Sequence, residues 1–343
     1  MPNNDLTSAG SNTAGDMRTT TNLKDIYYVV SATQDSFVYK TLGSNKNTTE
    51  ALLASAEDDF GTSYYFRGAV KNNYVEFANK CWRIVRVSGD GSVKLILHND
   101  NTAGVANPCD AANNSASAAF TGYSKFNSKS GDNTYVGFMY GTPGSSTYAA
   151  THANTNKSTI LTNLETWYNR YLKTYESVIA DTVWCNDKTN VTDTTYDPWG
   201  YNPNGLGYAE NATYYGATQR LVSTRGSAGG TGPSLKCNGE ISKITTKVGL
   251  ITADELAFAG YAHYMNNTAT YLQENATDIW WSLSPVSFGR FGSISIFCVS
   301  GSLGYFSSSH VSNSGEVRPS ISLRSTTYVT GNGSSEHPYT ISM

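Results

Sequence analysis

The sequence predicts an α+β domain in which many short strands and long loops surround two short helices. Runs rich in β-branched and aromatic residues begin near Phe60, and Gly- and Asn-rich turns separate them. Beyond residue 58, helical spacing is confined to two stretches of the 343-residue chain. No internal repeat with a period of about twenty to fifty residues is visible, which argues against a repeat architecture. Strands and helices mixed in this irregular way are typical of an α+β fold.

The first 57 residues are expected to be a polar lead-in to a folded domain that spans residues 58–343. Residues 1–22 are polar and low in complexity, which predicts disorder. Residues 25–40 are rich in β-branched and aromatic residues, so this segment predicts a strand or a hairpin arm. Residues 49–58 have the spacing of a short helix.

Several runs of strand-forming residues follow in the domain. A Ser-Gly-Asp-Gly turn separates two of the early runs, which predicts a hairpin or meander with Trp82 as a core anchor. The early runs lie at residues 63–70, 74–77, 81–87 and 92–98. Later apolar strands are expected at 135–140, 280–283 and 317–323, and the tail 328–341 predicts a hairpin.

Two stretches have the signals of helices. Between Ser158 and Tyr175 the apolar residues recur at helical spacing, and Ser158 stands at the N-cap position. Thr252 and Glu255 fit a capping box, in which the Thr and Glu side chains satisfy backbone N–H groups of the first turn. We expect that second helix to end at Gly260, because glycine is favoured just beyond a helix C-terminus.

Composition and charge argue against several classes of protein. Charged residues make up 15% of the chain and the net charge is −3, so no basic surface for nucleic acid is expected. No apolar run is long enough to span a membrane. Chains rich in Asn, Thr and aromatic residues but poor in Lys are common on bacterial surfaces, which predicts an extracellular protein. The N-terminus lacks the apolar core of a signal peptide, so attachment to a membrane or pilus would require an additional N-terminal segment.

No two of the five cysteines have CxxC spacing, which argues against a zinc site. Two disulfides and one free thiol form the simplest oxidised arrangement. We favour Cys81–Cys109 and Cys185–Cys237, because each pair joins cysteines that are neighbours along the chain across a loop-rich insertion. The alternative is five buried, reduced cysteines, and the spacing alone does not decide between the two.

No stretch has the pattern of a catalytic, phosphate-binding or metal-binding site. Gly226–Gly232 is glycine-rich but lacks the preceding strand and the following GK[ST] of a phosphate loop. The carboxylates between Asn186 and Asp197 lack the spacing of a calcium loop, and the five histidines show no paired spacing. Cys298 lies in an apolar strand without a neighbouring base, so an inert thiol is expected. We therefore expect no metal, no cofactor and no enzymatic activity.

The stretch from Pro285 to Gly315 has an unusual composition. Its thirty-one residues include ten serines and no Lys, Glu, Gln, Met, Trp, Asp, Thr or Ala. Aromatic residues and an arginine among small Ser and Gly residues are typical of binding surfaces such as antibody loops. Alternation of Ser293, Ser295 and Phe297 with Ile294, Ile296 and Cys298 predicts one face toward solvent and one toward the core. The alternative is a serine-rich hairpin whose aromatic residues fill gaps in the core.

Four motifs resemble the C-type-lectin-fold proteins of Firmicutes and related gut bacteria. They are YYFRGAVKNNYVEFANKCWRIVRVSGDGSVKLIL, GLITADELAFAG, WWSLSP and VRPSISL. This group is related to the formylglycine-generating-enzyme-like domains and includes the variable proteins of diversity-generating retroelements. The resemblance covers roughly residue 58 to the C-terminus. It implies a C-type lectin fold in which WWSLSP and VRPSISL are framework strands that flank the ligand face.

The resemblance further implies that residues 285–316 form a variable region that binds a ligand. In variable proteins this region is mutated at adenines, mostly in AAY codons, and a codon that ends in a pyrimidine cannot encode Lys, Glu, Gln, Met or Trp. Those five residue types are absent from the stretch that ends at Gly315. The side chains implied to face the ligand are Phe288, Arg290, Phe291, Ser293, Ser295, Phe297, Ser302, Tyr305, Ser308, His310, Ser312 and Asn313.

The sequence also departs from its relatives in ways that bear on function. Members of the group usually carry Gly directly before Val-Arg-Pro, whereas Glu316 occupies that position here. The calcium motifs EPN and QPD of sugar-binding lectins are absent, and Cys298 alone cannot supply the cysteine pair of an oxidase. The expected function is therefore binding of an unknown protein or surface glycan. The alternatives are a formylglycine-generating-type oxidase and a structural pilin or adhesin tip subunit.

Overall fold

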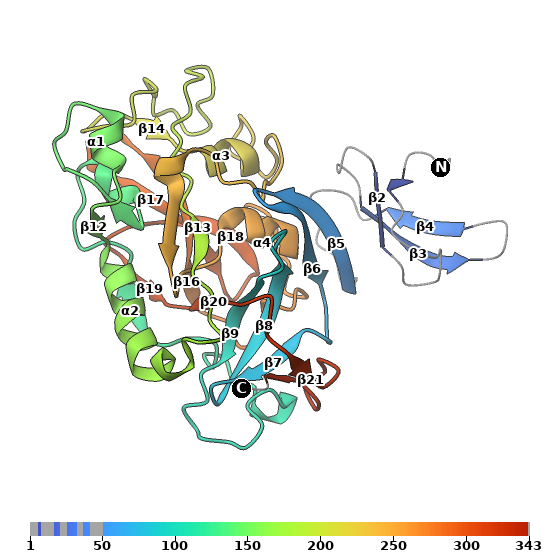
Figure 1. The fold of residues 1–343 in the computed structure, drawn as a ribbon. Helices are drawn as coiled ribbons and strands as arrows, with labels where there is room; N and C mark the ends of the chain where they lie inside the picture. Colours follow the sequence, from blue (N-terminus) through green and yellow to red (C-terminus); the bar gives the residue numbers. More distant parts are fainter. Residues whose placement is uncertain (1–5, 8–16, 21–25, 33–36, 42–50, 342–343) are drawn as a thin grey trace.

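The protein is a mixed α+β structure, built mostly of strands in open sheets with four short helices among the residues described (Figure 1). This computed structural model describes residues 6–7, 17–20, 26–32, 37–41 and 51–341. The α+β class expected from the sequence is confirmed. Two of the helices, α1 and α3, were not predicted.

A separate four-stranded antiparallel sheet forms near the N-terminus, in the order β1-β2-β3-β4. The strand expected within residues 25–40 is confirmed as β3 and β4. The disorder expected for residues 1–22 is wrong where β1 and β2 form, and the rest of that segment lies outside the described residues. The bounds are β1 (Leu6–Thr7), β2 (Met17–Thr20), β3 (Ile26–Ala32) and β4 (Phe37–Thr41).

The first large sheet has the strand order β20-β9-β8-β7-β22-β21, and β6 joins it by pairing with both β8 and β5. The last strand of the described chain, β22, therefore lies in the same sheet as the early strand β7, with which it pairs in parallel. The tail hairpin β21–β22 confirms the prediction for residues 328–341. The bounds are β5 (Ala51–Asp58), β6 (Gly61–Gly68), β7 (Tyr74–Phe77), β8 (Lys80–Val87), β9 (Val93–Asn99), β20 (Ser320–Leu323), β21 (Val329–Thr330) and β22 (Tyr339–Ile341).

The prediction of a short helix at residues 49–58 is wrong for residues 51–58, which form strand β5. Every residue of β5 pairs with β6, from Ala51 opposite Gly68 to Asp58 opposite Gly61. Alternate residues of β5 are buried, and Ala54 packs against Tyr65 and Leu235. Alanine has the highest helix propensity, but its advantage over other residues is less than about 1 kcal/mol per residue, so pairing along a whole neighbouring strand outweighs that preference.

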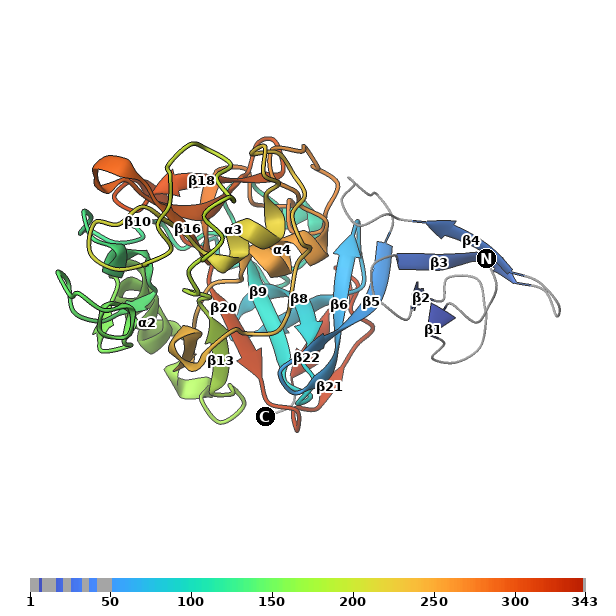
Figure 2. The same ribbon diagram turned by 90° about the horizontal axis from the view of Figure 1, so that it is seen from above.

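The second sheet has the order β10-β19-β16-β17-β18, and β14 pairs with the end of β16. In Figure 2, β16 and β18 of this sheet are orange, and β8 and β9 of the first large sheet are blue to teal. The bounds are β10 (Tyr123–Lys125), β14 (Thr213–Tyr214), β16 (Ile279–Phe288), β17 (Ile294–Ser300), β18 (Tyr305–His310) and β19 (Ser314–Glu316). Two small pairs complete the strands: β11 (Met139–Tyr140) with β12 (Asn156–Lys157), and β13 (Thr182–Cys185) with β15 (Lys243–Thr246).

The two predicted helices are confirmed together with their local start signals. Helix α2 (Thr159–Tyr171) has Ser158 as its N-cap, with the Ser158 hydroxyl accepting from the Leu161 N–H. Helix α4 (Ala253–Ala259) has the expected capping box, and Gly260 follows it with a φ of 117°. The additional helices are α1 (Tyr148–His152) and α3 (Gly216–Leu221). The apolar run 135–140 is only partly a strand, because a 3-10 turn (Asn133–Val136) precedes β11.

Two apolar cores lie on opposite faces of β17. One core joins Ile294 and Ile296 of this strand to Leu164 of α2 and to Trp82 of the first large sheet. The other core contains Phe297 and Val299 together with side chains of α3 and α4. Because both faces of β17 are covered along most of its length, this strand belongs to the framework as well as to the candidate surface.

Both favoured disulfides are present. The Cys81–Cys109 bond joins β8 to the loop after β9, and the Cys185–Cys237 bond joins β13 to the loop before β15. Cys298 is a buried free cysteine, and burial raises the pKa of its thiol to about 12. Two disulfides fit a secreted or extracellular protein. No helix among the described residues is long and apolar enough to cross a bilayer.

Candidate ligand-binding surface

The segment 285–316 forms much of the second sheet, including its edge strand β18 and the interior strand β19. It comprises the end of β16, the 3-10 turn Arg290–Gly292, strands β17 and β18 with the turn between them, and β19. Strands β17 and β18 are antiparallel, with Ser295 opposite His310, and the register between them is unbroken. The β17–β18 hairpin therefore ends the sheet, with β18 near the upper border of the molecule in Figure 2.

The residues implied to face a ligand fall into three environments. The side chain of Arg290 is outside the described part of the structure. Exposed residues are Phe291, Ser293, Ser302 and Asn313; partly buried residues are Ser295, Tyr305, Ser308, His310 and Ser312; and buried residues are Phe288 and Phe297.

Two expected ligand-facing residues are therefore core residues, and this part of the expectation is corrected. Phe288 ends β16 opposite Ile294 and packs in the first core. Phe297 lies in the second core, with its ring centroid 5.4 Å from that of Phe306. Side chains of β17 do alternate between two faces of the strand. The face that was expected to meet solvent is, however, covered by the second core at Phe297. Pattern alone could not show this, because a strand with both faces covered need not alternate in polarity.

Phe291 is the most exposed large apolar residue described. Its side chain is fully accessible, and its backbone has a φ of 65°, in the left-handed region. Non-glycine residues adopt this conformation uncommonly, because the Cβ crowds the following carbonyl. The tight turn between β16 and β17 thus holds a bare phenylalanine ring in solvent, where it has no packing role.

Trp281 fixes the position of Gly315, near the end of the segment 285–316. A Cβ added to Gly315 would lie 2.9 Å from the Trp281 Nε1, so only glycine fits at this point of β19. Trp281 Nε1–H donates to the Ser124 carbonyl at 2.8 Å, which also ties β16 to β10. Glu316 follows as a buried residue paired with Trp280 and Tyr123. The glycine that approaches the framework tryptophan therefore lies two residues before Val317 here.

A row of five aromatic rings lies alongside the β17–β18 hairpin, and we call it the aromatic row. Its members are Tyr201, Trp199, His263, Tyr264 and Tyr305. Successive ring centroids are 6.3, 6.0, 4.2 and 5.4 Å apart. Only Tyr305 belongs to the segment 285–316, so loops far away in the sequence contribute most of the row.

The aromatic row spans the hairpin from one end to the other. At the start of the hairpin, a Cβ added to Gly289 would lie 3.3 Å from the Tyr201 ring. At the far end, Tyr264 is 57% exposed and bonds the Ser307 hydroxyl at 3.2 Å, while Met265 and Leu303 add exposed apolar side chains. Sequence reasoning missed this contribution. The only local signal was the aromatic cluster Tyr-Ala-His-Tyr, which has no periodicity and follows helix α4.

Hydroxyl and amide groups make up the polar part of the surface. His310 Nδ1 lies 2.7 Å from the Ser312 hydroxyl, and the Asn313 amide donates to the Ser309 hydroxyl at 3.1 Å. Aromatic rings and small hydroxyls can bind a ligand through apolar contact and adaptable hydrogen bonds. Apart from Arg290, the segment from Pro285 to Gly315 contributes no Lys, Arg, Asp or Glu. Recognition here would therefore depend little on charge.

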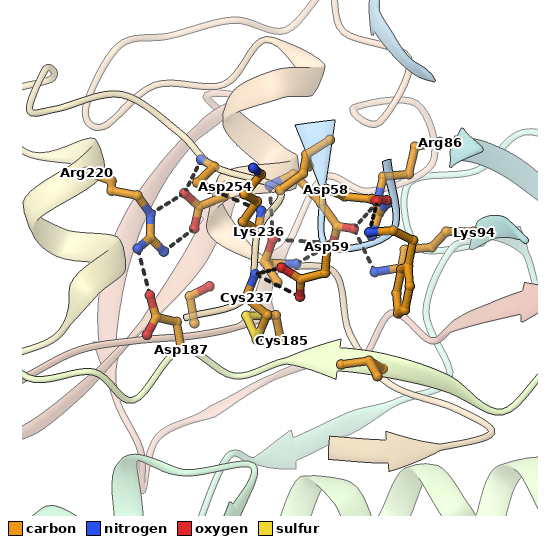
Figure 3. Close-up of a pocket in the computed structure, with 17 residues that line it drawn as sticks. Asp58, Asp59, Arg86, Lys94, Cys185, Asp187, Arg220, Lys236, Cys237 and Asp254 are labelled. Atoms are coloured by element: carbon orange, nitrogen blue, oxygen red, sulfur yellow. Dashed lines mark hydrogen bonds and ion pairs between the residues drawn. A yellow bond between two sulfur atoms is a disulfide. The ribbon is translucent and has the colours of Figure 1, made fainter. Parts of the chain in front are cut away.

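A second candidate is a small cavity of about 30 Å³ between the two large sheets, lined by charged side chains (Figure 3). On one side, Arg86 bonds Glu255 at 2.9 Å and Asp58 at 2.7 Å, and Lys94 bonds Glu255 at 2.7 Å. Burial alone would raise the pKa of the Glu255 carboxyl, but Lys94 and Arg86 outweigh it and hold the pKa at about 2. This cluster ties α4 to β8 and β9.

On the other side of the cavity, Arg220 of α3 forms two bonds to Asp254 at 2.7 and 2.8 Å and one to Asp187 at 2.6 Å. Burial opposes the charge of Arg220, but the two carboxylates outweigh it and raise the guanidinium pKa. Each of these charges is already paired within the protein, and the cavity has room for only about one water molecule. We therefore read the charged cavity as part of the framework.

The acidic loop considered as a calcium site has partners within the protein instead. Asp197 accepts hydrogen bonds from the Tyr214 hydroxyl and from the Tyr201 and Asn202 N–H groups. Asp193 accepts from the Thr195 N–H, and Asp187 pairs with Arg220. Within the described residues, no cluster of three or more His, Cys, Asp or Glu side chains could hold a metal ion.

Comparison of the chain with protein families, with curated proteins and with solved structures found no match.

Proposed function

We propose that this protein is an extracellular receptor- or adhesin-like protein that displays a diversified binding surface on a C-type lectin scaffold. The variable region would be residues 285–316, diversified by a retroelement. The scaffold would be the formylglycine-generating-enzyme-like variant of the fold. The ligand would be a protein or a surface glycan.

One observation carries this proposal: within a single hairpin, the framework and the candidate contacts occupy different side chains. Ile294, Ile296 and Val299 are fully buried in the two cores. Phe291 and Ser293 are exposed, and they can change without loss of packing. A surface that is to vary while its fold stays constant requires this division.

The state of the five cysteines gives less support to the alternative function, a formylglycine-generating-type oxidase. Cys298 is buried with a raised pKa, and the other four cysteines form disulfides. A reactive cysteine needs a lowered pKa and access to substrate. A structural tip subunit remains the competing function that experiment must separate from ligand binding.

Adhesion of protein-coated fluorescent beads to a panel of cultured bacterial and mammalian cells tests the proposal. We expect beads to adhere to at least one cell type, and a variant with Phe291, Tyr264 and Tyr305 replaced by Ala to lose adhesion. A matched variant replaces Phe60 and Tyr328, exposed aromatic residues outside this surface, and should adhere like the unaltered protein. Adhesion that survives the first variant would favour a structural subunit.

A further inference from the structure

Strand β18 is an edge strand with an open row of backbone groups. Within the described part of the chain, the only strand that pairs with β18 is β17. The Val311 N–H donates to the Ile294 carbonyl at 3.1 Å. Because backbone groups alternate in direction along an antiparallel strand, Ser309 also points its N–H and carbonyl toward β17. Ser308 and His310 therefore point theirs outward.

The neighbouring loop confirms this direction and leaves part of the edge open. Tyr264 N–H donates to the Phe306 carbonyl at 3.2 Å, so the loop already pairs with one end of the outer edge. At the other end of the edge, the Asn313 N–H donates a hydrogen bond to the His310 carbonyl. Between these two contacts, the Ser308 N–H, the Ser308 carbonyl and the His310 N–H have no hydrogen-bond partner among the described residues.

The open edge also lacks the features that usually block strand addition. Natural edge strands are protected by Lys, Pro or a bulge, each of which interferes with an incoming strand. The sequence of β18, YFSSSH, contains no Lys or Pro, and its pairing with β17 has no bulge. The small serine side chains leave room for a neighbouring backbone.

We propose that the β18 edge binds an extended polypeptide segment of the ligand, which adds to the second sheet as a further strand. Donor, acceptor and donor groups in line along about 7 Å match the backbone of a strand. The absence of charge on β18 favours an uncharged segment, and exposed Tyr264, Met265 and Leu303 favour apolar side chains at one end. This inference rests on the proposed function and narrows the ligand to a protein.

A phage-displayed library of random linear peptides, selected on the immobilised protein, provides the probe. A peptide enriched over a control surface would be synthesised with its backbone nitrogens methylated at odd positions, and separately at even positions. Only one of the two sets of backbone N–H groups faces β18. Methylation of that set should lower the affinity about tenfold or more, and methylation of the other set should lower it much less. Side chains are the same in both analogues, so recognition by side chains alone would not separate them.

Ser308→Pro removes an outward N–H that takes no part in the pairing with β17, and places a ring on the edge. We expect about a tenfold or greater loss of peptide affinity with an unchanged unfolding temperature. Ser308→Ala keeps the N–H and should weaken binding less. If Ser308→Pro destabilises the protein, the comparison of the two methylated analogues on the unaltered protein still decides.

Three results would overturn the edge inference. They are equal affinity of the two methylated analogues, full affinity of a folded Ser308→Pro variant, and the absence of any enriched peptide. In the first two cases, loss of binding in the Phe291, Tyr264 and Tyr305 variant would leave the proposed function standing. In the third case, the bead assay judges the proposed function independently, and adhesion blocked by free glycans would identify a glycan ligand instead.

Discussion

Two phenylalanines of the segment 285–316, three positions apart, have opposite environments. Phe288 is completely buried in the core, whereas Phe291 is fully accessible and lies in a left-handed turn. Their residue type is the same, so composition cannot distinguish a framework role from a contact role. The distinction comes from the point at which β16 ends and the turn begins.

Replacement of each phenylalanine by alanine should separate the two roles. Phe288→Ala should lower the free energy of unfolding by about 3–5 kcal/mol, because a large buried ring leaves a cavity. Phe291→Ala should change it by less than about 0.5 kcal/mol, because the ring contacts little of the protein. Urea unfolding of both variants measures this difference. Equal destabilisation would mean that Phe291 is also a packing residue.

Pairing of charged side chains between elements sets the response of the fold to acid. The pKa of the Glu255 carboxyl is lowered from 4.5 to about 2 in the folded protein. A lowered carboxyl pKa contributes stability above the unfolded value of 4.5, and this contribution is lost as the pH falls toward 2. The free energy of unfolding should therefore decrease between about pH 4.5 and pH 2.

A Glu255→Gln variant isolates this contribution. It should be less stable at neutral pH by about 3–5 kcal/mol, because it leaves Lys94 and Arg86 without their shared carboxylate. Its unfolding free energy should also fall less steeply between pH 4.5 and 2 than that of the unaltered protein. Parallel pH profiles for the two proteins would show that Glu255 does not supply the acid sensitivity.

The disulfide between Cys185 and Cys237 holds a long loop against β13. Its removal by replacement of both cysteines with alanine should lower the free energy of unfolding by about 2–4 kcal/mol, because the unfolded chain gains freedom. Chemical denaturation without reductant measures the loss. A variant as stable as the unaltered protein would show that other contacts already fix the loop.

Local signals explain which elements could be predicted from the sequence. The start of α2 and both ends of α4 were correct because Ser158, Thr252 and Gly260 act within one turn of their helices. Helix α2, however, ends at Tyr171, before the expected Tyr175. Strand β5 was misread because its structure comes from pairing with β6, which overrides the helix propensity of its alanines. Elements decided by a partner strand require knowledge of that partner.

Contacts between residues far apart in the sequence explain which features of the candidate ligand-binding surface could not be predicted. Phe297 was expected to face a ligand, but helices and loops from elsewhere in the chain bury it. The aromatic row joins Trp199 and His263 to Tyr305, residues that no spacing rule connects. The motifs that flank residues 285–316 did not reveal which residues elsewhere in the chain are the neighbours of this segment.

At the scale of the whole molecule, the protein separates a framework from the candidate ligand-binding surface. Pairing with β16 and burial in the two apolar cores hold the β17–β18 hairpin in a framework that also contains two disulfides. The hairpin, the Phe291 turn and Tyr264 of the aromatic row provide exposed apolar and hydroxyl groups, whereas His263 of the row is buried. If selection acts on that surface, changes in sequence should respect this division.

Sequencing many copies of the gene, from one population and from related loci, tests this central claim most directly. We expect substitutions confined to residues 285–316 and concentrated at exposed positions such as Phe291, Ser293, Ser302 and Asn313. Trp280 and Arg318, which are buried framework residues on either side, should stay constant. Substitutions spread evenly along the chain, or a segment 285–316 that never varies, would contradict a diversified binding surface.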